Sequence, residues 1–229
     1  MTANRYLDLE AHNDAICALV PAHVSLRPVL ALELKKVWYT GARILEIGCG
    51  PGDATLPILE STLADMDLLD VSSSMLEVCK RRLAPYADRL TYYCADALEH
   101  LLGSKPYDII HSSWTLHNFP QADKTILLQA IFDHLNPGGA FLLMDKVMPT
   151  HGGDILFKAQ LERYKLLPDD VCAAITEHEM HDISPEYRMD EVPLKAQLAG
   201  IGFSDIKIAM REERDIVLTA RRGLQTQAL

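Results

Sequence analysis

The stretch ILEIGCGPGDAT (residues 44–55) decides the fold of this chain. Apolar residues of β-forming type run directly into three glycines, Gly48, Gly50 and Gly52. Glycine loses more backbone freedom on folding than any other residue, so such a cluster needs a purpose. Loops at the carboxyl ends of parallel strands bind ligands, and glycines there let the backbone approach a bound molecule closely. The cluster therefore predicts a ligand-binding loop, with a plain tight turn as the alternative.

The spacing of the glycines argues against two phosphate-binding loops. The dinucleotide pattern GxGxxG requires a glycine at position 53, where the chain has Asp53. The lysine of a Walker loop is also missing from the sequence that follows. An acidic residue, Glu46, instead precedes the glycines within the strand. The loop thus fits neither pattern.

From residue 42 onward, strand and helix patterns alternate along the chain. Strands are predicted at 43–48, 66–71, 90–95, 107–113, 140–147, 204–210 and 214–221, and helices at 53–63, 72–83, 122–135 and 185–203. Alternation with short connections is typical of a parallel sheet covered by helices on both faces. The sequence predicts an α/β fold built as a single domain over residues 1–229.

Two helical segments are additions to this sheet. Residues 7–20 and 24–37 have helical spacing of apolar residues and are separated by Pro21, which predicts a helical cap over residues 1–38. Residues 154–167 and 169–181 predict a second helical insertion over 150–185. We expect both segments to fold over one edge of the sheet as a lid.

Composition excludes several classes of function. A net charge of -10 argues against a nucleic-acid partner, which needs a basic surface. The polar N-terminus resembles no signal peptide, and no apolar run is long enough to span a membrane. The five cysteines form no CxxC pair, which predicts free thiols in a reducing cytoplasm and no zinc site. A homodimer is compatible with the sequence.

The segment LEIGCGPG (45–52) resembles motif I of the class I S-adenosylmethionine-dependent methyltransferases, and the resemblance extends over about residues 40–220. It implies a Rossmann-like sheet of seven strands, mostly parallel with the last antiparallel, S-adenosylmethionine as cofactor and S-adenosylhomocysteine as product. The resemblance assigns the cofactor to Glu46, Gly48, Cys49, Gly50, Asp70, Val71, Asp96, Ala97 and Ser112. Asp70 would accept from the ribose hydroxyls and Asp96 from the adenine amine. Either acid could instead cap a helix.

The segment YDIIHSSWTLHNFP (107–120) resembles the fourth motif of the same family. His117 stands at the family's usual histidine position and is the candidate catalytic residue. Other candidates for a general base are His111, Asp145 and His178. By their positions, the side chains expected to line the acceptor pocket are Tyr6, Trp114, Lys146 and Tyr164.

Three further segments are similar to the family branch that includes methyltransferase domain 25 and carboxy-S-adenosylmethionine synthase: AICALVPAH, LNPGGAFLLMDKV and YKLLPDDVCAAI. The synthase pattern has a GCSLG loop and a basic lid segment, which this chain replaces with GCGPG and TEHEMH. No arginine that would hold a carboxylated cofactor is evident. These differences favour methyl transfer to a small molecule. Modification of the cofactor itself, and cofactor binding without catalysis, are the alternatives.

The segment EHEMHD (177–182) places His178 and His181 three residues apart, near two carboxylates. Two histidines and a carboxylate can hold a divalent metal ion. A solvated polar helix end is the simpler interpretation, and we expect no metal site.

Overall fold

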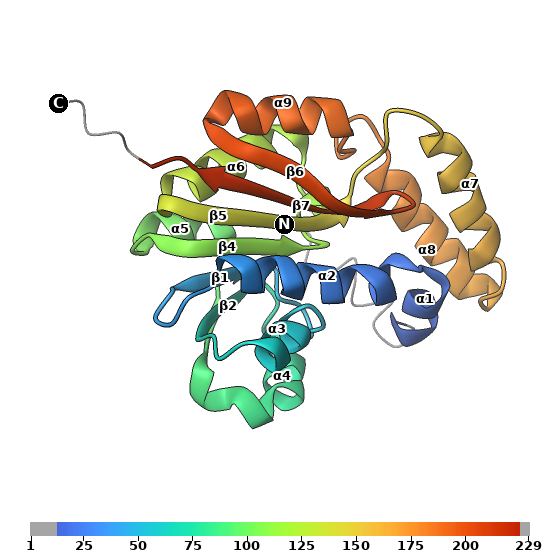
Figure 1. Ribbon diagram of the computed structural model, residues 1–229. Helices are drawn as coiled ribbons and strands as arrows, with labels where there is room; N and C mark the ends of the chain where they lie inside the picture. Colours follow the sequence, from blue (N-terminus) through green and yellow to red (C-terminus); the bar gives the residue numbers. More distant parts are fainter. Residues whose placement is uncertain (1–12, 225–229) are drawn as a thin grey trace.

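Seven strands form one sheet in the computed structural model, in the order β3-β2-β1-β4-β5-β7-β6 (Figure 1). The structure describes residues 13–224. β7 runs antiparallel to both of its neighbours, and the pairs formed by β1 to β5 are parallel. The mostly parallel sheet with an antiparallel last strand is therefore confirmed. The strands are β1 (Ile44–Ile47), β2 (Met66–Asp70), β3 (Leu90–Cys94), β4 (Tyr107–Ser113), β5 (Leu135–Lys146), β6 (Phe203–Glu212) and β7 (Asp215–Arg222).

Helices cover both faces of the sheet, and each face has its own hydrophobic core. Buried side chains of α2, α3 and α4 form one core with residues of the sheet, and those of α5, α6 and α9 form the other. Apolar side chains alternate between the two faces of each strand, so one sheet can feed both cores. The helices are α1 (Asn13–Leu19), α2 (Ala22–Val37), α3 (Thr55–Ser61), α4 (Ser73–Arg82), α5 (Ala97–Gly103), α6 (Gln121–Asp133), α7 (Gly153–Tyr164), α8 (Asp169–Asp182) and α9 (Glu191–Ile201).

Two helix predictions need correction. The helix predicted over 185–203 begins only at Glu191. The chain before it pairs with the segment after β5, because Met148 N donates to Met189 O (2.9 Å) and Glu191 N donates to Met148 O (3.1 Å). This long-range pairing uses backbone groups that a helix would need. The second difference is α5 (Ala97–Gly103), which our strand-and-helix pattern did not predict.

The helices α1, α7 and α8 gather at one end of the sheet, beyond the ends of β4 and β5 (Figure 1). The Arg163 side chain joins α7 to α1 and to the turn between β6 and β7, since its Nε donates to Leu19 O (2.9 Å) and its guanidinium pairs with Glu213. Tyr164, Val171 and Ile175 of α7 and α8 are buried in the same core as α2. Within residues 13–224, no helix is long and apolar enough to cross a membrane.

Candidate active site

The glycine loop follows β1 and is held against the ends of β2 and β4. Gly48 N donates to Leu69 O (2.8 Å), and Thr115 Oγ1 donates to Gly48 O (3.1 Å). A Cβ atom at Gly48 would lie 2.2 Å from Thr115 Oγ1, so no side chain fits there. Gly50 has φ +50°, and a Cβ atom at this position would meet no atom within 4 Å. Gly48 therefore permits the close approach of two loops, whereas Gly50 leaves space open.

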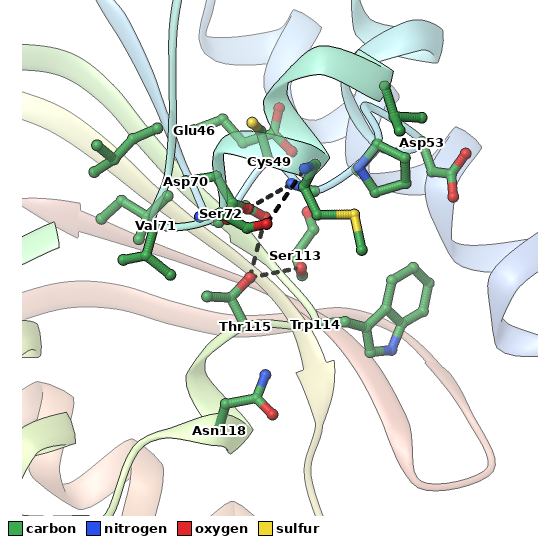
Figure 2. A pocket seen from close by; sticks show the side chains of 18 of the residues that line it. Glu46, Cys49, Asp53, Asp70, Val71, Ser72, Ser113, Trp114, Thr115 and Asn118 are labelled. Carbon is green, nitrogen blue, oxygen red and sulfur yellow. Dashed lines mark hydrogen bonds between the residues drawn. The ribbon is translucent and has the colours of Figure 1, made fainter. Parts of the chain in front are cut away.

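That space is a cavity of about 450 Å³ at the carboxyl ends of β1, β2 and β4 (Figure 2). Seven of the predicted cofactor residues line it: Glu46, Gly48, Cys49, Gly50, Asp70, Val71 and Ala97. Trp114, which we assigned to the acceptor pocket, lines it as well. The sequence argument missed other lining residues that come from the turn after β4 and from α2, among them Thr115, Asn118, His23 and Arg27.

Asp70 ends β2 and connects the glycine loop with the turn after β2 (Figure 2). Its Oδ2 accepts from Gly50 N (2.8 Å) and its Oδ1 accepts from Ser72 N (2.8 Å). Burial raises the pKa of the Asp70 carboxyl above its ordinary value. The N-cap of α4 is Ser72, whose Oγ accepts from Met75 N. The helix-cap alternative therefore does not describe Asp70, and its carboxylate forms part of the cavity wall.

The capping alternative does describe Asp96. Its Oδ1 accepts from Leu98 N (2.9 Å) and from Glu99 N (3.2 Å) at the start of α5. Asp96 is exposed, and the neighbouring Ala95 and Ala97 line the cavity in its place. Only its second oxygen is left for a ligand.

The expectation for Ser112 is corrected by the structure. Ser112 is fully buried and its Oγ donates to Ile47 O (3.2 Å) between two strands. Ser113, the next residue, lines the cavity. Successive side chains of a strand point to opposite faces, so the two serines do not both reach it.

Glu46 is buried beneath the glycine loop. Its Oε2 accepts from Thr55 Oγ1 (2.6 Å) and lies 3.6 Å from His111 Nε2. Burial raises the pKa of Glu46 to about 8 and lowers the pKa of His111 to about 3. Burial therefore disfavours the charged form of both side chains. His111 lies inside the sheet, with no exposed surface from which to act as a base.

Trp114 has an unusual backbone conformation at the end of β4. Its φ of 46° lies in the left-handed region, which bulky residues rarely adopt and which is common at functional sites. Trp114 N donates to Met144 O (2.7 Å), and its indole Nε1 donates to Asp215 Oδ1 (2.7 Å). The ring stacks on His23, with 4.2 Å between the ring centroids. The indole is thus held firmly in the wall of the cavity.

Behind Trp114 lies a second, much smaller cavity of about 30 Å³, between the helices α1, α7 and α8 and the ends of the strands. We call it the inner chamber. The predicted residues His117, Trp114, Lys146 and Tyr164 all line it, with His178 and Glu179 of α8. Tyr6, the other predicted pocket residue, lies outside the described residues. The inner chamber shares Trp114, His23 and His178 with the larger cavity.

His117 is held from behind by Asp145. It lies in the short helix η3 (Leu116–Asn118), and its Nδ1 donates to Asp145 Oδ1 (2.6 Å). The other oxygen of Asp145 accepts from Leu116 N (2.8 Å), so the carboxylate itself is fixed. His117 Nε2 is buried and has no hydrogen-bond partner among residues 13–224. The Asp145 carboxylate favours the tautomer whose lone pair is on Nε2, facing the inner chamber.

A network of buried charges joins α8 to the sheet. Lys146 Nζ donates to Glu179 Oε1 (3.0 Å) and to Asp182 Oδ2 (2.7 Å), both on α8. Arg214 Nη2 donates to Glu179 Oε2 (2.7 Å). Burial opposes ionisation of Glu179, but the charges of Lys146 and Arg214 outweigh it and lower the pKa to about 2. The network therefore fixes α8 over the end of β5.

Comparison with known proteins assigns the family. A family model described as a methyltransferase domain matches residues 44–139, which hold the glycine loop, Asp70, Asp96 and His117. Residues 44–139 therefore form a methyltransferase domain, and the chain is similar to class I S-adenosylmethionine-dependent methyltransferases. The cofactor of this methyltransferase family is S-adenosylmethionine. The match ends within β5, so α7 and α8 lie outside it.

The chain is similar to curated relatives with different reactions. It is 32% identical over 113 residues to a demethylmenaquinone methyltransferase of Symbiobacterium thermophilum, covering 48% of this chain and 44% of the relative. It is 27% identical to a carboxy-S-adenosyl-L-methionine synthase of Shewanella denitrificans, covering 59% and 57% of the two chains. The chain thus spans about half the length of these two relatives.

Solved structures share the fold. A magnesium protoporphyrin IX methyltransferase from Synechocystis with bound S-adenosylhomocysteine superposes with a TM-score of 0.63 at 18% identity, covering 88% of this chain and 83% of that one. An O-methyltransferase family protein from Burkholderia thailandensis gives a TM-score of 0.62 at 13% identity, covering 89% and 59%.

Proposed function

We propose that this methyltransferase transfers the methyl group of S-adenosylmethionine to a small-molecule acceptor beneath the lid. The observation that carries the proposal is the Asp70 carboxylate, which holds Gly50 N and lies in the wall of the 450 Å³ cavity. A carboxylate can accept hydrogen bonds from two vicinal hydroxyls at once, as a ribose offers. Gly48, Cys49 and Gly50 would face the methionine part of the cofactor, and Val71 and Ala97 the adenine.

The methyl group would point toward Trp114, where the two cavities meet. In the transfer, the bond between sulfur and the methyl carbon breaks and its electron pair stays on sulfur, while a lone pair of the acceptor forms the new bond. The sulfonium is already activated, so the protein supplies alignment and exclusion of water. Where the acceptor carries a proton, His117 Nε2 would take it, and Asp145 would stabilise the resulting imidazolium.

We assign the acceptor to a small molecule because the chain is acidic, with a net charge of -10, and offers no basic surface for a nucleic acid. The five cysteines of the sequence form no CxxC pair, which favours a reducing compartment, and we propose the cytoplasm.

Calorimetric titration with S-adenosylmethionine and with S-adenosylhomocysteine tests the cofactor assignment. A panel of metabolites, assayed for release of S-adenosylhomocysteine, tests the reaction. Binding of neither molecule at millimolar concentration would refute the proposal. Binding of both without turnover of any acceptor would favour a protein that binds the cofactor without catalysis.

We propose that residues 150–185 act as a lid and residues 1–38 as a cap in a single domain. Closure would exclude water from the sulfonium. Adding S-adenosylhomocysteine should slow amide exchange in 154–181 as well as in the glycine loop. Protection confined to residues 46–55, 70–72 and 95–98 would remove the lid role.

A second candidate is modification of the cofactor, as in the carboxy-S-adenosyl-L-methionine synthases to which the chain is similar. One observation favours it: Arg27 and Arg82 both line the cavity, although the sequence offered no obvious arginine. Both guanidinium groups pair with Asp53, which leaves less charge for a second carboxylate. A mass spectrum of the molecule that co-purifies with the protein separates the two candidates.

A further inference from the structure

Three side chains meet at the boundary between α8 and the turn after β4. His117 Nε2 lies 3.8 Å from Asp182 Oδ2, and His178 Nε2 lies 3.5 Å from the same oxygen. All three ligand atoms fall within 4.8 Å of one another. His117 is only 3% exposed, and its Nε2 accepts and donates no hydrogen bond within residues 13–224. A buried lone pair without a partner is costly, so this arrangement calls for a ligand.

The spacing fits a metal ion. Nitrogen and carboxylate ligands lie about 2.0 to 2.1 Å from zinc, so two ligands of a tetrahedral site are about 3.3 Å apart. The separations of 3.5 and 3.8 Å exceed that value by only a few tenths of an ångström. Two imidazoles and one carboxylate form a ligand set that zinc and iron(II) use, with positions left for substrate or water.

The surroundings of the three residues also suit a metal. Ligating histidines usually donate their second ring N–H to a carboxylate, which orients the ring. His117 does this, because its Nδ1 donates to Asp145 Oδ1 at 2.6 Å. The ligating carboxylate is usually hydrogen-bonded as well, and Asp182 Oδ2 accepts from Lys146 Nζ at 2.7 Å.

The local charge favours a cation. Four buried carboxyl groups surround this place, and three largely enclosed basic groups face them: Asp145, Glu179, Asp182 and Asp215 against Lys124, Lys146 and Arg214. The carboxyl groups therefore outnumber these basic groups by one.

We propose that His117, His178 and Asp182 bind one divalent transition-metal ion between the lid and the sheet. The acceptor would supply a further ligand through a hydroxyl or enol oxygen, whose proton is released to water when it binds the ion. With the ion bound, His117 Nε2 would be a ligand and no longer the base. The ion would instead stabilise the deprotonated oxygen of the acceptor. This catalytic role rests on the proposed methyl transfer, whereas binding of the ion does not.

The two histidines of this site, His117 and His178, differ from the pair that the sequence suggested, His178 and His181. His181, which shares its helix with His178, stacks on Tyr187 with 3.9 Å between the ring centroids. Its Nδ1 lies 3.5 Å from Asp182 Oδ1, and its side chain is 22% exposed. His117 comes from the opposite side of the inner chamber. His181 therefore provides a matched control on the same helix.

The test uses full-length protein stripped of metal by a chelator and titrated with Zn²⁺ and Co²⁺ alone. We expect one ion per chain in calorimetry, and a Co²⁺ absorption spectrum of nitrogen and oxygen ligation. His178→Ala and Asp182→Asn should each weaken binding by more than about 100-fold, and Asp145→Asn by about 10- to 100-fold. His181→Ala should change the affinity by less than about threefold. His117→Gln, which keeps much of the side-chain volume, should also weaken binding by more than about 100-fold, and it serves if the His178→Ala variant does not fold.

Three results would overturn the proposal: no binding by the wild-type protein, unchanged binding by a folded His178→Ala variant, or a sulfur-to-cobalt charge-transfer band that assigns the ion to cysteines. Titration of the metal-free protein with S-adenosylhomocysteine runs in parallel. Cofactor binding without metal binding removes the metal site and leaves the proposed methyl transfer intact. Metal binding without cofactor binding refutes the proposed methyl transfer and leaves the metal site intact.

Discussion

Replacing Asp70 with alanine should weaken the binding of S-adenosylmethionine by about 100-fold. Two of the acceptor positions of the carboxylate are occupied by Gly50 N and Ser72 N, each at 2.8 Å. The remaining positions face the cavity and would accept from two ribose hydroxyls. Hydrogen bonds to a charged group contribute about 1.5 kcal/mol or more each, so losing two costs about 3 kcal/mol. At 1.4 kcal/mol for each factor of ten, this is about 100-fold in Kd.

Isothermal calorimetry with S-adenosylmethionine measures this change. Asp67→Ala is the control, because Asp67 lies on the same strand, accepts from Tyr107 OH (2.9 Å) and is not among the residues that line the cavity. Its affinity for the cofactor should stay within about threefold of wild type. Unchanged affinity in a folded Asp70→Ala variant would refute the ribose role. An equal loss in both variants would point to distortion of β2 instead.

Three further predictions follow from other parts of the structure. Gly50→Val should abolish cofactor binding in the same titration, because φ is +50° and the side chain would enter the cavity; normal binding would mean that the loop does not hold the cofactor. Lys146→Met should lower the free energy of unfolding by about 3 to 5 kcal/mol and speed amide exchange in α8, because Glu179 and Asp182 lose their shared partner; urea denaturation showing no loss would contradict this. Burial lowers the pKa of His111 to about 3, so the unfolded chain takes up this proton first as the pH falls below about 6.5. The free energy of unfolding should then fall by about 1.4 kcal/mol per pH unit through this group. Urea unfolding at pH 7 and pH 5 should show a smaller loss of stability for His111→Asn than for the wild type.

Much of the fold follows from local sequence. Strand and helix patterns with short connections allow few arrangements other than a parallel sheet, and the observed strand order agrees with one. The glycine loop and Asp70 were also predictable, because the loop follows β1 and Asp70 ends β2. Neighbouring parallel strands have their carboxyl ends at the same edge of the sheet. The observed bond from Gly50 N to Asp70 Oδ2 is a product of that geometry.

Local rules also explain where two site predictions needed refinement. An aspartate such as Asp96 can either bind a ligand or cap a helix. In the structure it is the N-cap of α5, where one carboxylate oxygen accepts from backbone N–H groups. Ser112 and Ser113 are adjacent at the end of β4, and only the orientation of the strand decides which one faces the cavity.

The sequence by itself determined the sheet, its glycine loop and the class of cofactor, because these depend on short motifs and on periodicity. Only the tertiary structure decided the inner chamber. His117 comes from the turn after β4, Lys146 from the end of β5 and His178 and Asp182 from α8, and no spacing along the chain relates them. The spacing of His178 and Asp182, one helical turn apart, was the available signal, but their partner could not be read from it. These side chains meet because the apolar faces of α7 and α8 pack onto the core beside α2, which brings a polar strip of α8 over the strand ends.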